Sequence, residues 1–121
     1  MKRIVLLLAS ALLLALAPVT PSYAATFTST VTIRLSPYAN SIHGRVSSSH
    51  TPCTINRGIT VYELTPTSAP YADAVTDSSG RWNTSSVPGP VPAGKYRAYA
   101  SRQVARGGTC LRAASPTLTV R

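Results

Sequence analysis

Residues 95–103 read KYRAYASRQ, and the alternation in this stretch decides the fold class. In an extended chain, successive side chains point to opposite faces, so residues two apart share a face. No stretch after residue 24 keeps apolar residues at helical spacing over three turns, and the sequence therefore predicts an all-β protein. The inward set of this strand is Tyr96, Ala98 and Ala100, and the outward set is Lys95, Arg97 and Tyr99.

The same period of two recurs in six other short segments on either side of this strand. Turn residues separate the segments, and the clearest tight turn is Asp77-Ser78-Ser79-Gly80, because Asp can bond its own backbone and Gly allows positive φ. Seven such strands in about a hundred residues predict a two-sheet sandwich of the immunoglobulin/transthyretin-like class, with a small closed barrel as the alternative. The predicted strands cover residues 28–35, 42–48, 58–64, 71–76, 80–84, 95–103 and 115–121.

The first 24 residues have the organisation of a secretory signal peptide. Lys2 and Arg3 precede an apolar run over residues 4–17, and small residues at positions 22 and 24 predict cleavage after Ala24. An uncleaved membrane anchor is the alternative, but the run is shorter than the roughly 20 residues that span a bilayer. We therefore expect one secreted, soluble domain over residues 25–121, monomeric and without a membrane span.

The chain has two cysteines, Cys53 and Cys110. In an exported protein, two thiols tend to form one disulfide. If successive strands reverse direction, the loop after the second strand and the loop after the sixth lie at the same end of the sandwich, so the cysteines can meet. We expect a disulfide that joins these loops and does not cross the centre of the core. Two free buried cysteines are the alternative.

The chain is strongly basic, with 12 Lys and Arg against three Asp and Glu and a formal net charge of +9. A basic surface attracts nucleic acids, anionic polymers, acidic lipids and acidic proteins, although a solvated arginine rim is the alternative. Loops of one end, held by a disulfide, are a common place for a binding site. We therefore expect an anionic partner at the disulfide end, where five arginines lie in or beside the connections: Arg57, Arg81, Arg102, Arg106 and Arg112.

The sequence offers little for catalysis. Its two histidines, His43 and His50, fall on the outward face of the second strand and in the following loop, at a spacing that does not suggest a ligand pair. Asp73 and Asp77 flank a turn, where a structural role is expected. With both cysteines in a disulfide, a zinc site would lack its usual ligands. We expect no catalytic residue, no metal and no cofactor, with a hydrolase that uses a histidine as the alternative.

Three segments carry a family resemblance: HGRV at 43–46, TDSSGRW at 76–82 and PAGKY at 92–96. Together they resemble the carboxypeptidase-regulatory-like and collagen-binding-protein B-type domains of secreted bacterial proteins, whose sandwiches are similar to the transthyretin fold. The resemblance covers residues 42–100 and implies a non-catalytic spacer, stalk or adhesive module. The chain departs from the pattern in its cysteine pair and in having no matched Lys and Asn for an isopeptide cross-link.

Two functions of different classes follow from these features. The first is a secreted non-catalytic module that acts by surface binding, to an anionic partner or a cell-surface polymer. The second is a small secreted inhibitor of an extracellular hydrolase, which would present the disulfide-tied loops to the enzyme.

Overall fold

The computed structural model describes residues 25–121, and in this part the chain forms strands and one short 3-10 helix, η1 (Thr51–Cys53), but no α-helix. The all-β prediction is confirmed. The predicted signal peptide, residues 1–24, lies outside the described residues. Among the residues described, no helix has the length and apolarity needed to cross a membrane. The strands are β1 (Ala25–Phe27), β2 (Thr30–Val31), β3 (Arg34–Leu35), β4 (Ile42–Ser47), β5 (Gly58–Glu63), β6 (Ala69–Val75), β7 (Arg81–Asn83), β8 (Gly94–Ala100), β9 (Gln103–Ala105), β10 (Gly108–Cys110), β11 (Ala113–Ala114) and β12 (Leu118–Val120).

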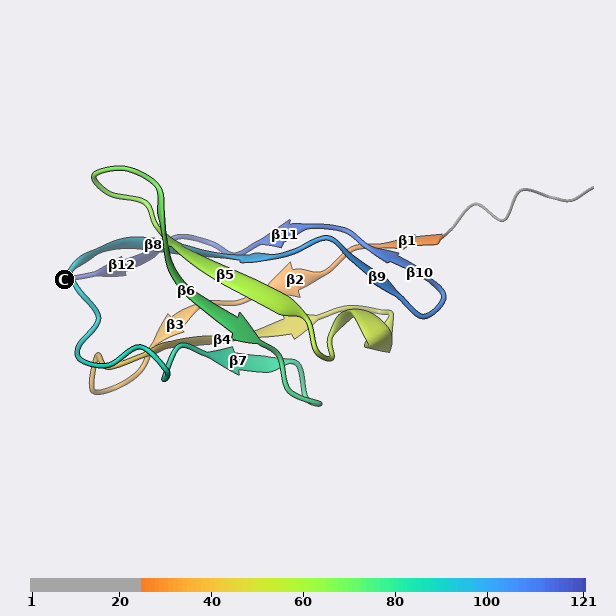
Figure 1. Ribbon diagram of the computed structural model, residues 1–121, viewed down its shortest axis with the longest axis horizontal. Coiled ribbons are helices and arrows are strands. Elements are labelled where there is room, and N and C mark those ends of the chain that lie inside the picture. The colour runs from red at the N-terminus through yellow and green to blue at the C-terminus, as the bar shows by residue number, and fades with distance from the viewer. Residues whose placement is uncertain (1–24) are drawn as a thin grey trace, which may run out of the picture.

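Two larger sheets share one core (Figure 1). One sheet has the order β11-β8-β5-β6, and β12 also pairs with β8. The other has β4 at its centre, with β2 and β3 on one edge and β7 on the other. This arrangement is consistent with a β-sandwich. The core draws on both sheets: Val31, Ile42, Val46 and Trp82 come from the second, and Ile59, Val61, Tyr96, Ala98, Ala100 and Val120 come from the first.

A third, small sheet of order β1-β10-β9 extends one end of the molecule (Figure 1). β1 runs parallel to β10, with Ala25 opposite Gly108 and Phe27 opposite Cys110. None of the seven predicted strands includes these residues. β10 pairs with β9 along one edge, and the backbone of β1 supplies hydrogen-bond partners along the other edge.

Two predicted strands are interrupted. The strand predicted over residues 28–35 divides into β2 and β3, because the Thr32 hydroxyl accepts the N–H of Arg45 at 2.9 Å in place of a regular backbone pair. A Cβ at Gly44 would collide with the Thr32 carbonyl, so this close approach requires glycine. The strand predicted over residues 95–103 ends at Ala100, and residues 103–105 form β9 of a separate hairpin. The prediction of seven continuous strands is therefore too simple.

Side-chain hydrogen bonds hold two of the chain reversals in place. Asp77 Oδ1 accepts the N–H groups of Ser79 at 2.8 Å and Arg81 at 3.0 Å, and Gly80 has φ 79°, so the predicted turn is confirmed. At the other end of the molecule, the hydroxyl of Tyr96 donates to the carbonyl oxygen of Pro92 at 2.7 Å. This bond ties the start of β8 to the crossover that precedes it.

Candidate functional site

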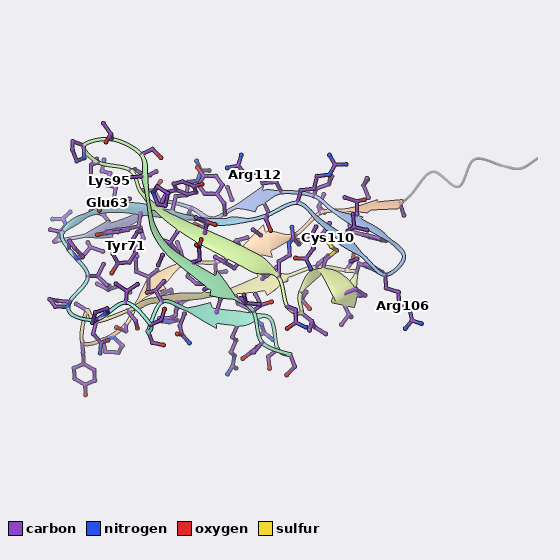
Figure 2. All side chains as sticks on the ribbon, in the orientation of Figure 1. Glu63, Tyr71, Lys95, Arg106, Cys110 and Arg112 are labelled. Atoms are coloured by element: carbon purple, nitrogen blue, oxygen red, sulfur yellow. A yellow bond between two sulfur atoms is a disulfide. The ribbon has the colours of Figure 1, made fainter. Side chains whose placement is uncertain are left out.

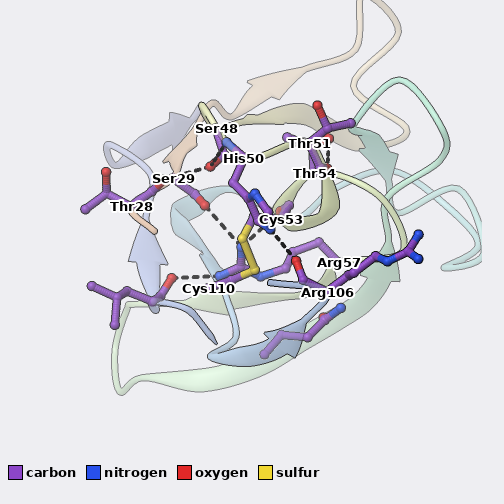
Figure 3. Close-up of a disulfide and its surroundings, with 12 residues drawn as sticks. Thr28, Ser29, Ser48, His50, Thr51, Cys53, Thr54, Arg57, Arg106 and Cys110 are labelled. Atoms are coloured by element: carbon purple, nitrogen blue, oxygen red, sulfur yellow. Dashed lines mark hydrogen bonds between the residues drawn. A yellow bond between two sulfur atoms is a disulfide. The ribbon is translucent and has the colours of Figure 1, made fainter. Parts of the chain in front are cut away.

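The predicted disulfide is present (Figure 3), and Cys110 lies toward the end of the molecule that carries the β9–β10 hairpin (Figure 2). Cys53 ends the 3-10 helix between β4 and β5, and Cys110 ends β10. Their Cα atoms are 5.5 Å apart and both side chains are fully buried. The bond therefore joins the connection after the second predicted strand to the segment after the sixth, as we expected.

Arg57 is a structural residue of this end and not part of a binding surface. Its side chain is 0% exposed, and its guanidinium donates to four oxygens from separate segments. Burial lowers the pKa of Arg57, but a guanidinium held by oxygens stays charged at neutral pH. Its candidate binding role is thus corrected, because no partner could reach it. The acceptors are the carbonyls of Cys53, Ser101 and Leu111 and the hydroxyl of Ser29.

The other four predicted arginines do not form one surface. Arg102 and Arg106 are exposed beside and within the β9–β10 hairpin, whereas Arg81 is exposed on β7. Arg112 lies next to β11, and its guanidinium carbon is 4.5 Å from the centre of the Tyr99 ring. Figure 2 shows Arg106 and Arg112 on different parts of the molecule.

The two histidines have different surroundings. The ring of His50 stacks on Phe27 of β1 at 3.8 Å between centres and 10° between planes. Its Nε2 contacts the carbonyl oxygen of Arg106, and since a carbonyl can only accept, Nε2 carries the proton (Figure 3). His43 lies on the outward side of β4, between Arg34 and Asn83. Within residues 25–121, no group of three or more His, Cys, Asp or Glu side chains could hold a metal ion.

Four basic residues lie together on the outer side of the β4 sheet, although the sequence alone did not group them. We call this set the basic face: Arg34, His43, Arg45 and Arg81. Strand pairing produces it. Arg34 lies opposite His43, and Arg45 lies opposite Arg81 on the next row of the same side. The three arginines are exposed, and an open hollow of about 570 Å³ lies among these residues, with Thr32 and Asn83 at its border.

Like charges directly opposite each other across a sheet are destabilising. The Arg45–Arg81 pair therefore reduces stability relative to a neutral pair, unless an anion neutralises it. Arg45 has one internal partner, because its Nε donates to the carbonyl oxygen of Ser79 at 3.2 Å. The nearby carboxylate is Asp77, whose pKa is lowered by backbone hydrogen bonds from Arg81 and Ser79 and, less strongly, by the charges of Arg81 and Arg45.

Trp82 lies between the two charged rows, opposite Gly44. Its side chain is 2% exposed, and its indole Nε1 has no hydrogen-bond partner among the residues described. Trp82 and Gly44 also line the hollow of the basic face. The indole fills the core behind the face, and the absent side chain of Gly44 leaves room for it, since a Cβ there would lie 2.6 Å from Trp82 Cζ2.

The sequence contained part of the signal for the basic face. Alternation along β4 already placed His43 and Arg45 outward together. The missing information was the pairing of β4 with β7, the second and fifth predicted strands, which brings Arg81 beside Arg45. Comparison with known proteins found no matching family model, no matching curated protein and no matching solved structure.

Proposed function

We propose that the protein is a non-catalytic binding module that holds an anionic polymer on its basic face. The observation that carries this proposal is the pairing of Arg45 with Arg81 beside the pairing of Arg34 with His43. The arginines keep exposed guanidinium groups, which bind phosphate, sulfate and carboxylate groups through paired N–H donors.

The shape of the basic face favours a polymer over a small ligand. Small-molecule sites are usually deep cavities, whereas this hollow is open, with charged and polar side chains at its border beside Trp82 and Gly44. Rows on one side of a strand are about 7 Å apart, and neighbouring strands are about 5 Å apart. Cations at these intervals can bind successive anionic groups of an extended chain.

We also propose that the protein is secreted and that its sheets form an immunoglobulin/transthyretin-like sandwich. A buried disulfide supports an oxidising compartment. The hydrogen bond from Tyr96 to Pro92 supports the proposal of an immunoglobulin-like fold, because it resembles the tyrosine corner of that fold. In a tyrosine corner, a tyrosine near the start of the sixth strand forms a hydrogen bond to the backbone a few residues upstream. The motifs at 43–46, 76–82 and 92–96 support a relation to the carboxypeptidase-regulatory-like domains.

The binding proposal is tested by elution from immobilised heparin, a sulfated polymer, in a salt gradient. The double variant Arg45→Gln, Arg81→Gln should elute at clearly lower salt than the native protein. The matched control is Arg102→Gln, Arg106→Gln, which removes the same charge from the β9–β10 hairpin and should elute closer to the native protein. Equal shifts for both variants would mean that net charge alone retains the protein, and the proposal would then be wrong.

One observation favours the inhibitor as a second candidate function. Val104 is 84% exposed in β9, between Arg102 and Arg106, and its hairpin is anchored by the disulfide. An apolar side chain held on a rigid projecting hairpin is suited to an enzyme cleft. If the protein inhibits a hydrolase with 1:1 stoichiometry, Val104→Asp should abolish the inhibition and leave heparin binding unchanged. Inhibition that survives Val104→Asp would exclude this hairpin as the inhibitory element.

A further inference from the structure

The outward side of the five-stranded sheet carries a second cluster, which we call the tyrosine–arginine patch: the half-buried Tyr62, Arg97 and Tyr99 and the exposed Arg112. It lies on the outward side of the central strands β5 and β8, where Tyr62 is paired with Arg97. Arg112 reaches the patch from the residue before β11. The patch and the basic face lie on different sheets, each on the side away from the core.

The side chains of the patch hold one another in place. The rings of Tyr62 and Tyr99 meet edge to face, with centres 5.4 Å apart and planes at 85°. Arg112 lies over the Tyr99 ring, Arg97 lies 5.6 Å from it, and Arg97 Nε donates to the carbonyl oxygen of Ser115 at 2.8 Å. Fixed tyrosines and arginines lose little conformational entropy on binding, and these residue types are enriched among the strongest contacts of protein interfaces.

The charges at the two borders of the patch are opposite. One row across the sheet runs from Asp73 on β6 through Thr60 on β5 to Tyr99 on β8 and Ala114 on β11. Asp73 accepts a hydrogen bond from the Thr60 hydroxyl at 3.0 Å, which leaves most of its carboxylate lone pairs for other donors. Arg112 comes from the other border, where it precedes β11, the third strand from β6, and its guanidinium extends over the Tyr99 ring.

We propose that the tyrosine–arginine patch is the interface of a two-fold symmetric homodimer. A two-fold axis that runs parallel to the strands, above the patch between β5 and β8, packs the two patches face to face and brings Asp73 of each protomer to Arg112 of its partner, because a two-fold interface uses the same surface twice. The tyrosines then pack at the centre, and an ion pair forms on either side. A polyanion fits this patch less well, because Asp73 repels it.

The dimer extends the binding function without sharing its residues. Joining the protomers through the five-stranded sheets leaves both basic faces on the outside. Two such faces can bind one polymer, or two, and the second contact benefits from a raised effective concentration. Sequence alone led us to expect a monomer, because a β-strand pattern does not reveal which outward side chains of different strands meet.

The proposal is tested by sedimentation of the native chain at about 0.15 M salt, where the Debye length is about 8 Å and the repulsion between like-charged protomers is reduced. The native chain should sediment as a dimer at high protein concentration. Asp73→Arg alone and Arg112→Asp alone should each sediment as a monomer. An equimolar mixture of the two variants should form a heterodimer, since both ion pairs are then restored with reversed polarity.

The mixture also serves as the folding control, because misfolded variants would not recombine. Arg106→Asp makes the same charge change as Arg112→Asp at a site outside the patch, and this variant should remain dimeric. A native chain that stays monomeric at all concentrations would overturn the proposal. Single variants that remain dimers, or a mixture that stays monomeric, would overturn it as well.

Discussion

The disulfide end and the basic face both contain arginines, but the arginines differ in how many protein acceptors they already have. Arg57 is fully buried and gives its N–H groups to four oxygens of the chain. Arg45 is exposed and gives one N–H group to the Ser79 carbonyl. An arginine whose donors are used inside the protein stabilises the fold, whereas an exposed arginine opposite another cation is available to an anion. The predictions below test this division between the two regions.

The largest effect should follow from removing the disulfide. The Cys53→Ala, Cys110→Ala double variant frees a loop closed over a sequence separation of 57 residues. In the chain-entropy model such a loop contributes about 4 kcal/mol to the free energy of unfolding. Urea unfolding should show a loss of this size, and the folded fraction should still elute from heparin at the native salt concentration. If the fully folded double variant elutes from heparin at a different salt concentration from the native protein, the separation between a stabilising disulfide end and a binding basic face is contradicted.

The next effect concerns Arg57. The substitution Arg57→Met leaves four oxygens without their hydrogen-bond donor. Each unsatisfied buried polar group lowers the free energy of unfolding by about 1–3 kcal/mol. Because the backbone can relax and admit water, we expect a total loss of about 3 kcal/mol, measured by urea unfolding. The control is Arg106→Met, whose side chain is exposed and should change the stability by less than about 0.5 kcal/mol. Equal losses in both variants would show that Arg57 is not a structural residue.

These two regions also show what the sequence could and could not predict. Alternation placed Tyr96, Ala98 and Ala100 inward correctly, because a strand with one buried face repeats every two residues. The disulfide followed from two cysteines and the reversal of strands. The burial of Arg57 did not follow, because its acceptors at residues 29, 53, 101 and 111 come together only in the folded chain.

The basic face was partly predictable for a similar reason. The outward direction of His43 and Arg45 follows from one strand, but the position of Arg81 depends on pairing between β4 and β7. That pairing joins segments almost forty residues apart in the sequence, and no local pattern encodes it. The pairing of β1 with β10 was missed for the same cause, since β1 has only three residues and follows the predicted cleavage site directly.

A smaller effect should come from Asp77, the carboxylate beside the basic face. Asp77→Asn removes a negative charge close to Arg45 and Arg81. Screened Coulomb attraction at this range predicts about two- to threefold tighter binding of a polyanion at low salt. Titration calorimetry with inorganic polyphosphate would measure the change. The matched control is Glu63→Gln on β5 of the other sheet, which should have a weaker effect. Weaker binding by Asp77→Asn would mean that the turn, and not the charge, controls the face.

The most direct test of the basic face is the salt dependence of binding to double-stranded DNA, used as a polyanion of known counterion release. The logarithm of the binding constant falls with the logarithm of salt concentration by about 0.9 for each phosphate neutralised. The Arg45→Gln, Arg81→Gln variant should therefore reduce the slope by close to 2 relative to the native protein. The Arg102→Gln, Arg106→Gln variant should reduce it by much less. Equal reductions in both variants, or a larger one for the hairpin, would contradict the assignment of anion binding to the basic face.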